Sequence, residues 1–315
     1  MSNQAVIVGG TIAIDNVITP QAEAKELLGG SAAYAALAAS YFTKPVHLVG
    51  IIGHDYPQQH LDMLESHGVT LTGVERSNGE SFTWTGEYHA NMNDRTTHRV
   101  GLNVLENWSV QVPEEIASTS IVVLANMSPD NQLQMLQGCT ATSRFVIADT
   151  MDLWINIANE RLHDVLRVID LFVINEGEAR EFTGTSNLIL AGQRLLEKGP
   201  RFVIIKLGEF GAMLFTGNPA GWEVSPVTFF RSAAFPLHEV ADPTGAGDTF
   251  LGALAGYLAS LGKSNFGFED IRQAVVKGSI LASFTCEEFS TRKLQSLRHE
   301  DIRARENLFK VLTSW

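Results

Sequence analysis

The chain has 315 residues, 45% of them hydrophobic, and a formal net charge of -12, because 35 acidic residues outnumber 23 Lys and Arg residues. It is long enough to bury one large core, and it lacks the basic surface of a nucleic-acid-binding protein. No stretch approaches the roughly 18 consecutive apolar residues of a membrane helix, and the N-terminus is unlike a secretion signal. We therefore expect a cytoplasmic protein that acts on small molecules, with neither nucleic acid nor membrane as its partner.

Short apolar segments rich in β-branched residues alternate with helical patterns along the chain. The expected strands are 5–10, 46–52, 120–125, 144–149, 171–175 and 202–208. The expected helices are 31–42, 56–68 and 188–199, followed by 246–261, 267–284 and 295–312. This alternation predicts a single α/β domain over 1–315, with a mostly parallel sheet flanked by helices. Ligands of such sheets gather at the carboxyl ends of the strands.

One segment departs from this alternation. Residues 80–101 contain Thr, Trp, Tyr and Val around an Asn/Asp turn and have no helix between them, which predicts an antiparallel hairpin. Residues 11–18 could join it to form a small flap beside the main sheet. The same pattern also fits an ordinary hairpin at the edge of that sheet.

The sequence ADPTGAGDTF at 241–250 combines glycines and acids just before a helical pattern. Gly245, Ala246 and Gly247 then lie at a helix N-terminus, where free N–H groups and the helix dipole can bind a phosphate. Asp248, in the first helical turn, could accept a proton from an attacking hydroxyl. Alternatively, the Asp and Thr residues of this loop only cap the helix. Neither a Walker A loop nor a GxGxxG dinucleotide motif is present.

The segment DPTGAGDTF at 242–250 resembles the second signature of the ribokinase-like (pfkB) family of sugar and nucleoside kinases. Further segments resemble motifs of that family and occur in the family's order along nearly the whole chain. They are GTIAID at 10–15, LLGGSAAY at 27–34, VGIIGHDYPQQHLDMLESHGV at 49–69, NEGEA at 175–179 and KLGEFGAMLF at 206–215. The sequence is thus identified as a member of this family.

The resemblance implies an ATP-dependent phosphotransferase with a Rossmann-like core and a β-sheet lid made from parts of 11–19 and 80–101. Asp248 would be the catalytic base, and the N–H groups of Gly245, Ala246 and Gly247 would form the anion hole. A lid that closes over the substrates would keep water away from the γ-phosphate.

The resemblance also implies binding roles for further residues. Asn175 and Glu178 would organise Mg²⁺, a hard cation that prefers oxygen ligands, although the same pair also fits a helix capping box. The positions implied for the nucleotide are Asn175, Lys206, Gly208, Thr244, Gly245 and Gly247, and those implied for the acceptor are Asp15, Gly29, Gly30 and Tyr34. A monovalent cation could be required in addition.

The acceptor side departs from the pattern of ribose kinases. Tyr34 stands where they carry an Asn that binds the sugar, Ala13 replaces another Asn, and 126–132 has no counterpart of their sugar-binding Glu. Each lost hydrogen bond weakens ribose binding by about 1 kcal/mol, so ribose itself is doubtful.

Tyr34 suits a larger acceptor, such as a modified sugar or a nucleoside. The first hypothesis is therefore a sugar kinase, the second a nucleoside kinase, and the third a non-catalytic sensor of the same ligands. Trp84, Tyr88 and His98 could face the substrate or pack within the lid. We expect a homodimer that pairs through lid strands.

Overall fold

The computed structural model describes residues 4–217 and 229–314, and within these ranges nine strands form one sheet in the order β13-β12-β11-β10-β9-β8-β1-β4-β5. All neighbouring pairs from β11 to β5 are parallel. Strand β12 pairs antiparallel with both of its neighbours, β11 and β13. The strands are β1 (Val6–Gly9), β4 (Val46–Ile52), β5 (Val69–Arg76), β8 (Ile121–Leu124), β9 (Phe145–Asp149), β10 (Leu171–Asn175), β11 (Phe202–Lys206), β12 (Ala212–Thr216) and β13 (Phe229–Ser232). The mostly parallel α/β sheet predicted from the sequence is thus confirmed.

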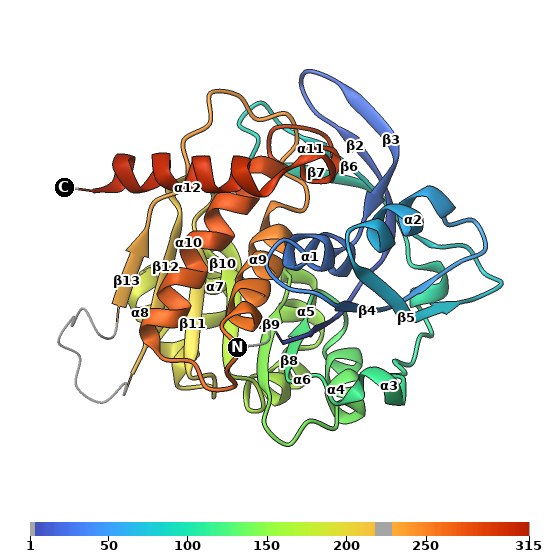
Figure 1. Ribbon diagram of the computed structural model, residues 1–315, viewed down its shortest axis with the longest axis horizontal. Helices are drawn as coiled ribbons and strands as arrows, with labels where there is room; N and C mark the ends of the chain where they lie inside the picture. Colours follow the sequence, from blue (N-terminus) through green and yellow to red (C-terminus); the bar gives the residue numbers. More distant parts are fainter. Residues whose placement is uncertain (1–3, 218–228, 315) are drawn as a thin grey trace.

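Helices cover both faces of this sheet (Figure 1). One face carries α1 (Ser31–Ala39), α2 (Gln58–Ser66), α9 (Ala246–Ser260), α10 (Phe268–Thr285), α11 (Arg292–Ser296) and α12 (His299–Thr313). The other carries α3 (Glu114–Ala117), α4 (Pro129–Gly138), α5 (Asp152–Ile157), α6 (Asn159–Leu166), α7 (Glu176–Thr183) and α8 (Leu188–Leu196). Because successive residues of a strand point to opposite faces, Val6 and Val8 of β1 enter the first core and Ile7 enters the second.

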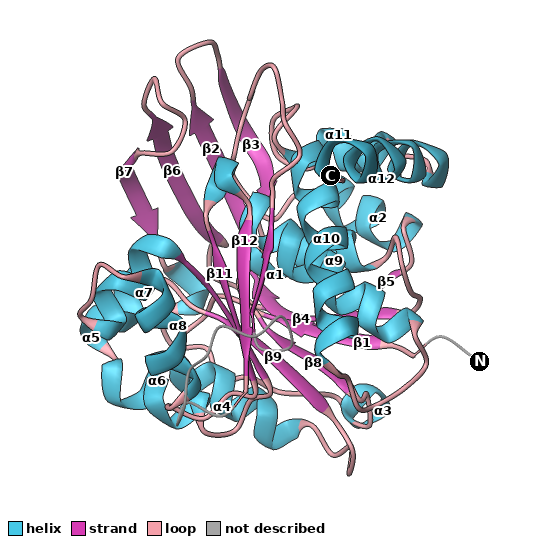
Figure 2. Cartoon of the chain, turned by 90° about the vertical axis from the view of Figure 1, so that its left-hand side faces the viewer, coloured by secondary structure: helices cyan, strands magenta, loops and turns pink. Residues whose placement is uncertain are grey.

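The small sheet, as we call the second sheet, has four strands in the order β3-β2-β6-β7 within the described residues. They are β2 (Ala13–Ile18), β3 (Glu23–Gly29), β6 (Phe82–Tyr88) and β7 (Arg95–Gly101). The predicted hairpin is β6–β7, and it joins β2 through parallel pairing, apart from the main sheet (Figure 2). The alternative of an ordinary edge hairpin is therefore wrong.

Two sequence expectations about helices and turns need correction. The helix expected at 295–312 is divided into α11 and α12, because Leu297 is extended and Asp301 caps a new helix by accepting the Arg298 N–H at 3.0 Å. The strand expected at 202–208 ends at Lys206, since Gly208 has a φ of 56° and begins a short 3-10 turn.

Helices α1 and α9 pack with their backbones in contact. A Cβ atom on Gly252 of α9 would lie 2.0 Å from the carbonyl oxygen of Ala35 in α1. This close approach fixes the start of α9 beside α1, where the sequence places the candidate site. In the described part of the chain, no helix is both long and apolar enough to cross a bilayer.

Candidate functional site

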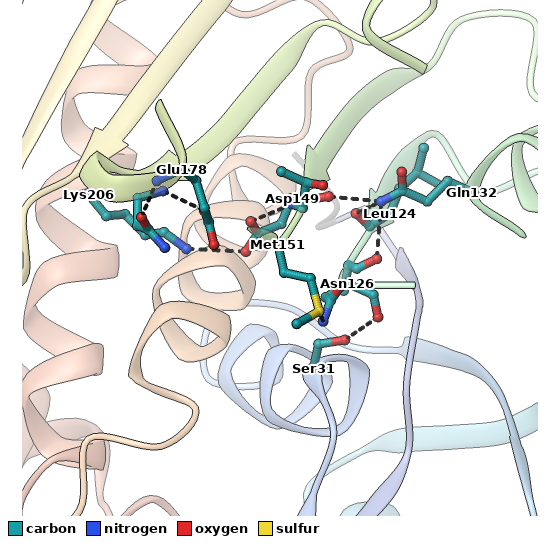
Figure 3. A network of polar contacts seen from close by, with 11 residues as sticks. Ser31, Leu124, Asn126, Gln132, Asp149, Met151, Glu178 and Lys206 are labelled. Atoms are coloured by element: carbon teal, nitrogen blue, oxygen red, sulfur yellow. Dashed lines mark hydrogen bonds and ion pairs between the residues drawn. The ribbon is translucent and has the colours of Figure 1, made fainter. Parts of the chain in front are cut away.

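Three neighbouring parallel strands end with polar side chains at the same edge of the main sheet. Asp149 ends β9, Asn175 ends β10 and Lys206 ends β11, with Asn175 directly beside Lys206 in the register. The ammonium group of Lys206 lies 3.2 Å from Asp149 Oδ2. Figure 3 draws this ion pair as a dashed line. The carboxyl edge of the sheet therefore carries a buried ion pair that the sequence analysis did not identify.

Lys206 is a largely buried cation surrounded by acids. Burial lowers its pKa, but the carboxylates of Asp149, Glu178 and Asp248 outweigh burial and hold the pKa above its usual value. The nitrogen Nζ would lie 3.0 Å from a Cβ atom placed on Gly247. A fixed positive charge thus lies against the glycine loop that precedes α9.

Asn175 and Glu178 form the capping box that the sequence allowed. Asn175 Oδ1 accepts the Glu178 N–H at 2.9 Å, and Glu178 Oε2 accepts the Asn175 N–H at 3.0 Å. Burial, followed by repulsion from Asp149, raises the pKa of Glu178 to about 7, against the opposing effect of Lys206. The Glu178 carboxyl group has a second oxygen outside the capping box, and a bound cation would favour its ionised form.

These oxygen donors are of the kind that Mg²⁺ prefers, so Glu178 and Asn175 fit the metal role that the resemblance implies. In the ranges 4–217 and 229–314, however, no cluster of three or more His, Cys, Asp or Glu side chains is arranged to hold a metal ion by itself. A Mg²⁺ ion here would take further ligands from water and phosphate, as it commonly does in kinases.

The loop before α9 presents backbone N–H groups without a side-chain cap. Gly245, with a φ of 76°, is the N-cap residue of α9, and no side-chain hydrogen bond caps the helix there. The Ala246 N–H donates to the carbonyl oxygen of Pro243 at 3.2 Å, whereas the N–H groups of Gly245 and Gly247 have no acceptor among the described residues. The loop therefore leaves two of the three predicted anion-hole amides open at the positive end of a helix.

Asp242, rather than Asp248, holds this loop in place. Its side chain is fully buried and accepts the Thr244 N–H and the Ser290 N–H, each at 2.9 Å. This arrangement leaves the Asp248 carboxylate free of a capping duty. Removal from water, then repulsion by Asp149, raises the pKa of Asp248 to about 6, while Lys206 and Arg95 act in the opposite direction.

The residues predicted for the acceptor lie next to the loop. Asp15 of β2 is 5% exposed, and a Cβ atom on Gly29 would lie 2.1 Å from its carboxyl carbon. Gly30 also leaves no space for a side chain. Its φ is 91°, and a Cβ there would lie 2.4 Å from the carbonyl oxygen of Thr11. The Tyr34 ring of α1 packs under Gly245, where a Cβ would lie 2.3 Å from a ring carbon.

Two hydroxyl groups near Asp15 are buried without a hydrogen bond among the described residues, those of Tyr34 and Tyr56. The Tyr34 hydroxyl approaches Ser290 without reaching normal hydrogen-bond geometry. Buried polar groups usually have partners, so these two hydroxyls mark a place where a polar ligand would be favourable. Tyr56 was not singled out from the sequence.

The hairpin of the small sheet reaches the loop and the nucleotide positions. Tyr88 is 7% exposed, and its hydroxyl accepts a hydrogen bond from Thr244 Oγ1 at 3.3 Å. Asn93 Oδ1, in the turn of the hairpin, would lie 3.6 Å from a Cβ on Gly208. Tyr88 therefore faces the site.

Trp84 and His98, the other two hairpin residues that the sequence singled out, interact within the small sheet. Trp84 Nε1 donates to Thr97 Oγ1 at 3.3 Å, and His98 Nε2 lies 2.8 Å from Glu87 Oε2 with about half of each side chain exposed. The sequence hypothesis that Trp84 and His98 could face the substrate is therefore not supported by their contacts.

Sequence reasoning brought most of the site together but missed Asp149, Tyr56 and Arg95. Asp149 had a signal, since it ends the apolar run at 144–149 in the same way that Asn175 ends its own strand. Arg95 had none, because only pairing with Tyr88 in the folded hairpin brings its charge near enough to lower the pKa of Asp248.

Comparisons with known proteins identify relatives of this chain. Residues 7–297 match the model of the pfkB family of carbohydrate kinases. The chain is 27% identical to the cytidine kinase of Thermococcus kodakarensis over 258 residues, which is 80% of this chain and 88% of that protein.

Two solved structures share the fold. An Escherichia coli protein assigned as a ribokinase II, in complex with ATP and Mg²⁺, has a TM-score of 0.77 and 19% identity, over 98% of this chain and 100% of that one. The aminoimidazole riboside kinase of Salmonella enterica, complexed with aminoimidazole riboside and an ATP analogue, has a TM-score of 0.73 and 16% identity, over 96% and 99%. With its signature loop at the start of α9 and a family match over nearly its whole length, the chain belongs to the pfkB family of carbohydrate kinases.

Proposed function

We propose that the protein transfers the γ-phosphate of ATP, in the presence of Mg²⁺, to the hydroxymethyl group of a sugar. The observation that carries this proposal is the position of Asp248. Its carboxylate lies in the first turn of α9, beside two open backbone amides and the buried cation of Lys206. A base next to an anion-binding loop is the arrangement that phosphoryl transfer to an alcohol requires.

Each group has one task in the reaction. The acceptor oxygen bonds to the γ-phosphorus as the bond from that phosphorus to the bridging oxygen of ADP breaks, and the acceptor proton passes to Asp248. The N–H groups of Gly245 and Gly247 and the ammonium group of Lys206 stabilise the charge on the transferring group. Mg²⁺ held near Glu178 and Asn175 would neutralise part of the phosphate charge. The small sheet acts as the lid of a single domain and excludes competing water.

The acceptor side supports binding of hydroxyl groups deep in the protein. Asp15 supplies a buried carboxyl group, whose pKa is raised to about 8 by burial and by the nearby Asp242 and Asp248. The unpaired hydroxyls of Tyr34 and Tyr56 supply two further polar atoms close to it. Together they provide donors and acceptors for the hydroxyls of a sugar.

A nucleoside is the second candidate acceptor. The relative that spans 80% of this chain is a cytidine kinase, and one solved relative was crystallised with aminoimidazole riboside. Ala13 and Tyr34 replace the small polar residues of ribose kinases with apolar and aromatic surface. Such a surface favours an acceptor that carries a base on its ribose.

The experiment that tests the proposal measures ADP release from Mg-ATP with a panel of pentoses, hexoses, keto-deoxy sugars and nucleosides. We expect one acceptor class to stimulate ADP release and to yield a phosphorylated product of matching mass. Stimulation by nucleosides alone would select the second candidate. Ligands that bind without turnover would contradict the kinase assignment and favour a sensor instead.

Pairing of two chains through the small sheet also stays a prediction. Val100, on the edge strand β7, is 51% exposed, and Leu102 just beyond it is 47% exposed. An unpaired strand edge with apolar side chains is favourable for association with a second copy.

A further inference from the structure

The hairpin β6–β7 approaches the candidate site at two points. At the first, Tyr88 of β6 accepts a hydrogen bond from Thr244, the residue before Gly245. At the second, Asn93 in the turn approaches Gly208, two residues after the end of β11. The turn between β6 and β7 therefore spans the distance from the anion-hole loop to the nucleotide positions.

Arg95 lies on the neighbouring strand, directly beside the first of these points. It is the first residue of β7, two positions after Asn93, and it is the direct cross-strand partner of Tyr88. Its side chain is exposed and makes no ion pair or hydrogen bond with any residue that the structure describes. The other Arg of this strand, Arg99, is paired with Thr85, farther from the turn.

The positive charge of Arg95 affects two groups of the site. It lowers the pKa of Asp248 and that of Tyr88, although burial raises both. A guanidinium group offers several N–H donors in one plane, which match the oxygens of a phosphate. An unpaired guanidinium at this place is therefore available to an anion between the hairpin and the loop.

We propose that Arg95 binds the transferring phosphoryl group from the side of the small sheet, opposite Lys206 and the loop amides. This inference rests on the proposed kinase function and assigns a further catalytic residue to it. As the acceptor oxygen bonds to the γ-phosphorus and the bond to ADP breaks, Arg95 donates hydrogen bonds to the non-bridging oxygens. Charge accumulates on these oxygens during transfer.

The placement of Arg95 on the hairpin has a consequence for control of the reaction. Lys206 belongs to the rigid main sheet and is present whether or not the hairpin lies over the loop. Arg95 reaches the phosphoryl group only when the hairpin is in place. Full stabilisation of the transferring group then requires that the small sheet covers the site, and that position also excludes water.

The test compares Arg95→Gln with Arg99→Gln, which removes the same charge from the same strand. We expect Arg95→Gln to lower kcat by about 100-fold, as the loss of one transition-state donor does, and to change the KM of the acceptor little. Arg95→Lys should restore part of the rate. Arg99→Gln should stay within about twofold of the wild type, since surface substitutions usually have small effects.

A second measurement separates this inference from the kinase proposal. Binding of a non-hydrolysable ATP analogue and of ADP is measured by calorimetry on both variants. Arg95→Gln should weaken binding of the analogue several-fold and leave ADP unchanged, because only the analogue carries the γ-phosphate. If the wild type binds ATP but transfers to no acceptor, the kinase proposal fails, and this comparison still decides the role of Arg95.

The pH dependence of kcat gives an independent readout. Asp248 is faced by the carboxylate of Asp149, by the carboxyl group of Asp15 and by the cations Lys206 and Arg95. Without Arg95, the acidic limb of the profile should move to higher pH, and it should not move in Arg99→Gln. An unchanged kcat in Arg95→Gln, or equal losses of analogue and ADP binding, would overturn the inference.

Discussion

The proposed role of Asp15 in acceptor binding comes with a cost in stability. Burial, together with repulsion from Asp242 and Asp248, raises its pKa from 3.8 to about 8. The folded protein therefore holds a proton that the unfolded chain releases above pH 4. Because the folded state binds more protons, the free energy of unfolding falls as the pH rises through this interval, by up to about 1.4 kcal/mol per pH unit.

This fall in the free energy of unfolding with rising pH leads to a prediction for Asp15→Asn. The substitution keeps the shape of the side chain but cannot ionise. The variant should gain stability relative to the wild type as the pH rises from about 4 to about 8, while its affinity for the acceptor falls at least about tenfold. Urea denaturation at a series of pH values measures the first effect, and KM measures the second.

The matched control is Asp62→Asn, on the exposed side of α2. Its free energy of unfolding should follow that of the wild type at every pH. Parallel curves for Asp15→Asn and the wild type would show that Asp15 is not a buried acid of raised pKa.

Helix α9 begins at the loop to which we assign catalysis, and its position depends on glycines. Cβ atoms on Gly252 and Gly256 would lie 2.0 Å and 2.5 Å from the carbonyl oxygens of Ala35 and Ala39. These contacts bring α9 against α1, the helix that carries Tyr34. The spacing of the two helices thus sets the distance between the loop and the acceptor residues.

Gly252→Ala should force the two helices apart. We expect a loss of about 2 kcal/mol in the free energy of unfolding, typical of overpacking, and a lower kcat, since Asp248 lies one turn before the substitution. Gly267→Ala, where the new Cβ would meet only Asp270 at 3.8 Å, should change both by little. Thermal unfolding and steady-state kinetics measure the effects, and a fully stable and active Gly252→Ala would contradict this account of the packing.

The elements that could be predicted from the sequence are those with local signals. Apolar β-branched runs identified the central strands, and the GAGD loop identified the start of α9, because both patterns depend on neighbouring residues. Strand β3 was missed, since Ala24, Lys25 and Glu26 favour helix. Pairing of residues on both sides of Lys25 and Glu26 with β2 makes the segment a strand. The pairs Lys206–Asp149 and Thr244–Tyr88 join residues 57 and 156 positions apart, which no local pattern reveals.

At the scale of the whole molecule, the site lies where three parts of the chain meet. The main sheet supplies Lys206, the helix α9 supplies Asp248, and the small sheet supplies Asp15 and the hairpin. The protein has a net charge of -12, so a polyphosphate must bind against an overall repulsion. Local cations and oriented amides at the loop provide the attraction that the molecule as a whole does not.

The most direct test of the central claim is phosphoryl transfer by Asp248→Asn, with ATP binding measured on the same preparation. We predict that kcat falls by about 1,000-fold, within the range for a lost general base, while the affinity for ATP stays within about twofold. In the wild type, kcat should fall as the pH drops below about 6, where Asp248 becomes protonated. Transfer by Asp248→Asn at the wild-type rate would contradict the assignment of Asp248 as the base.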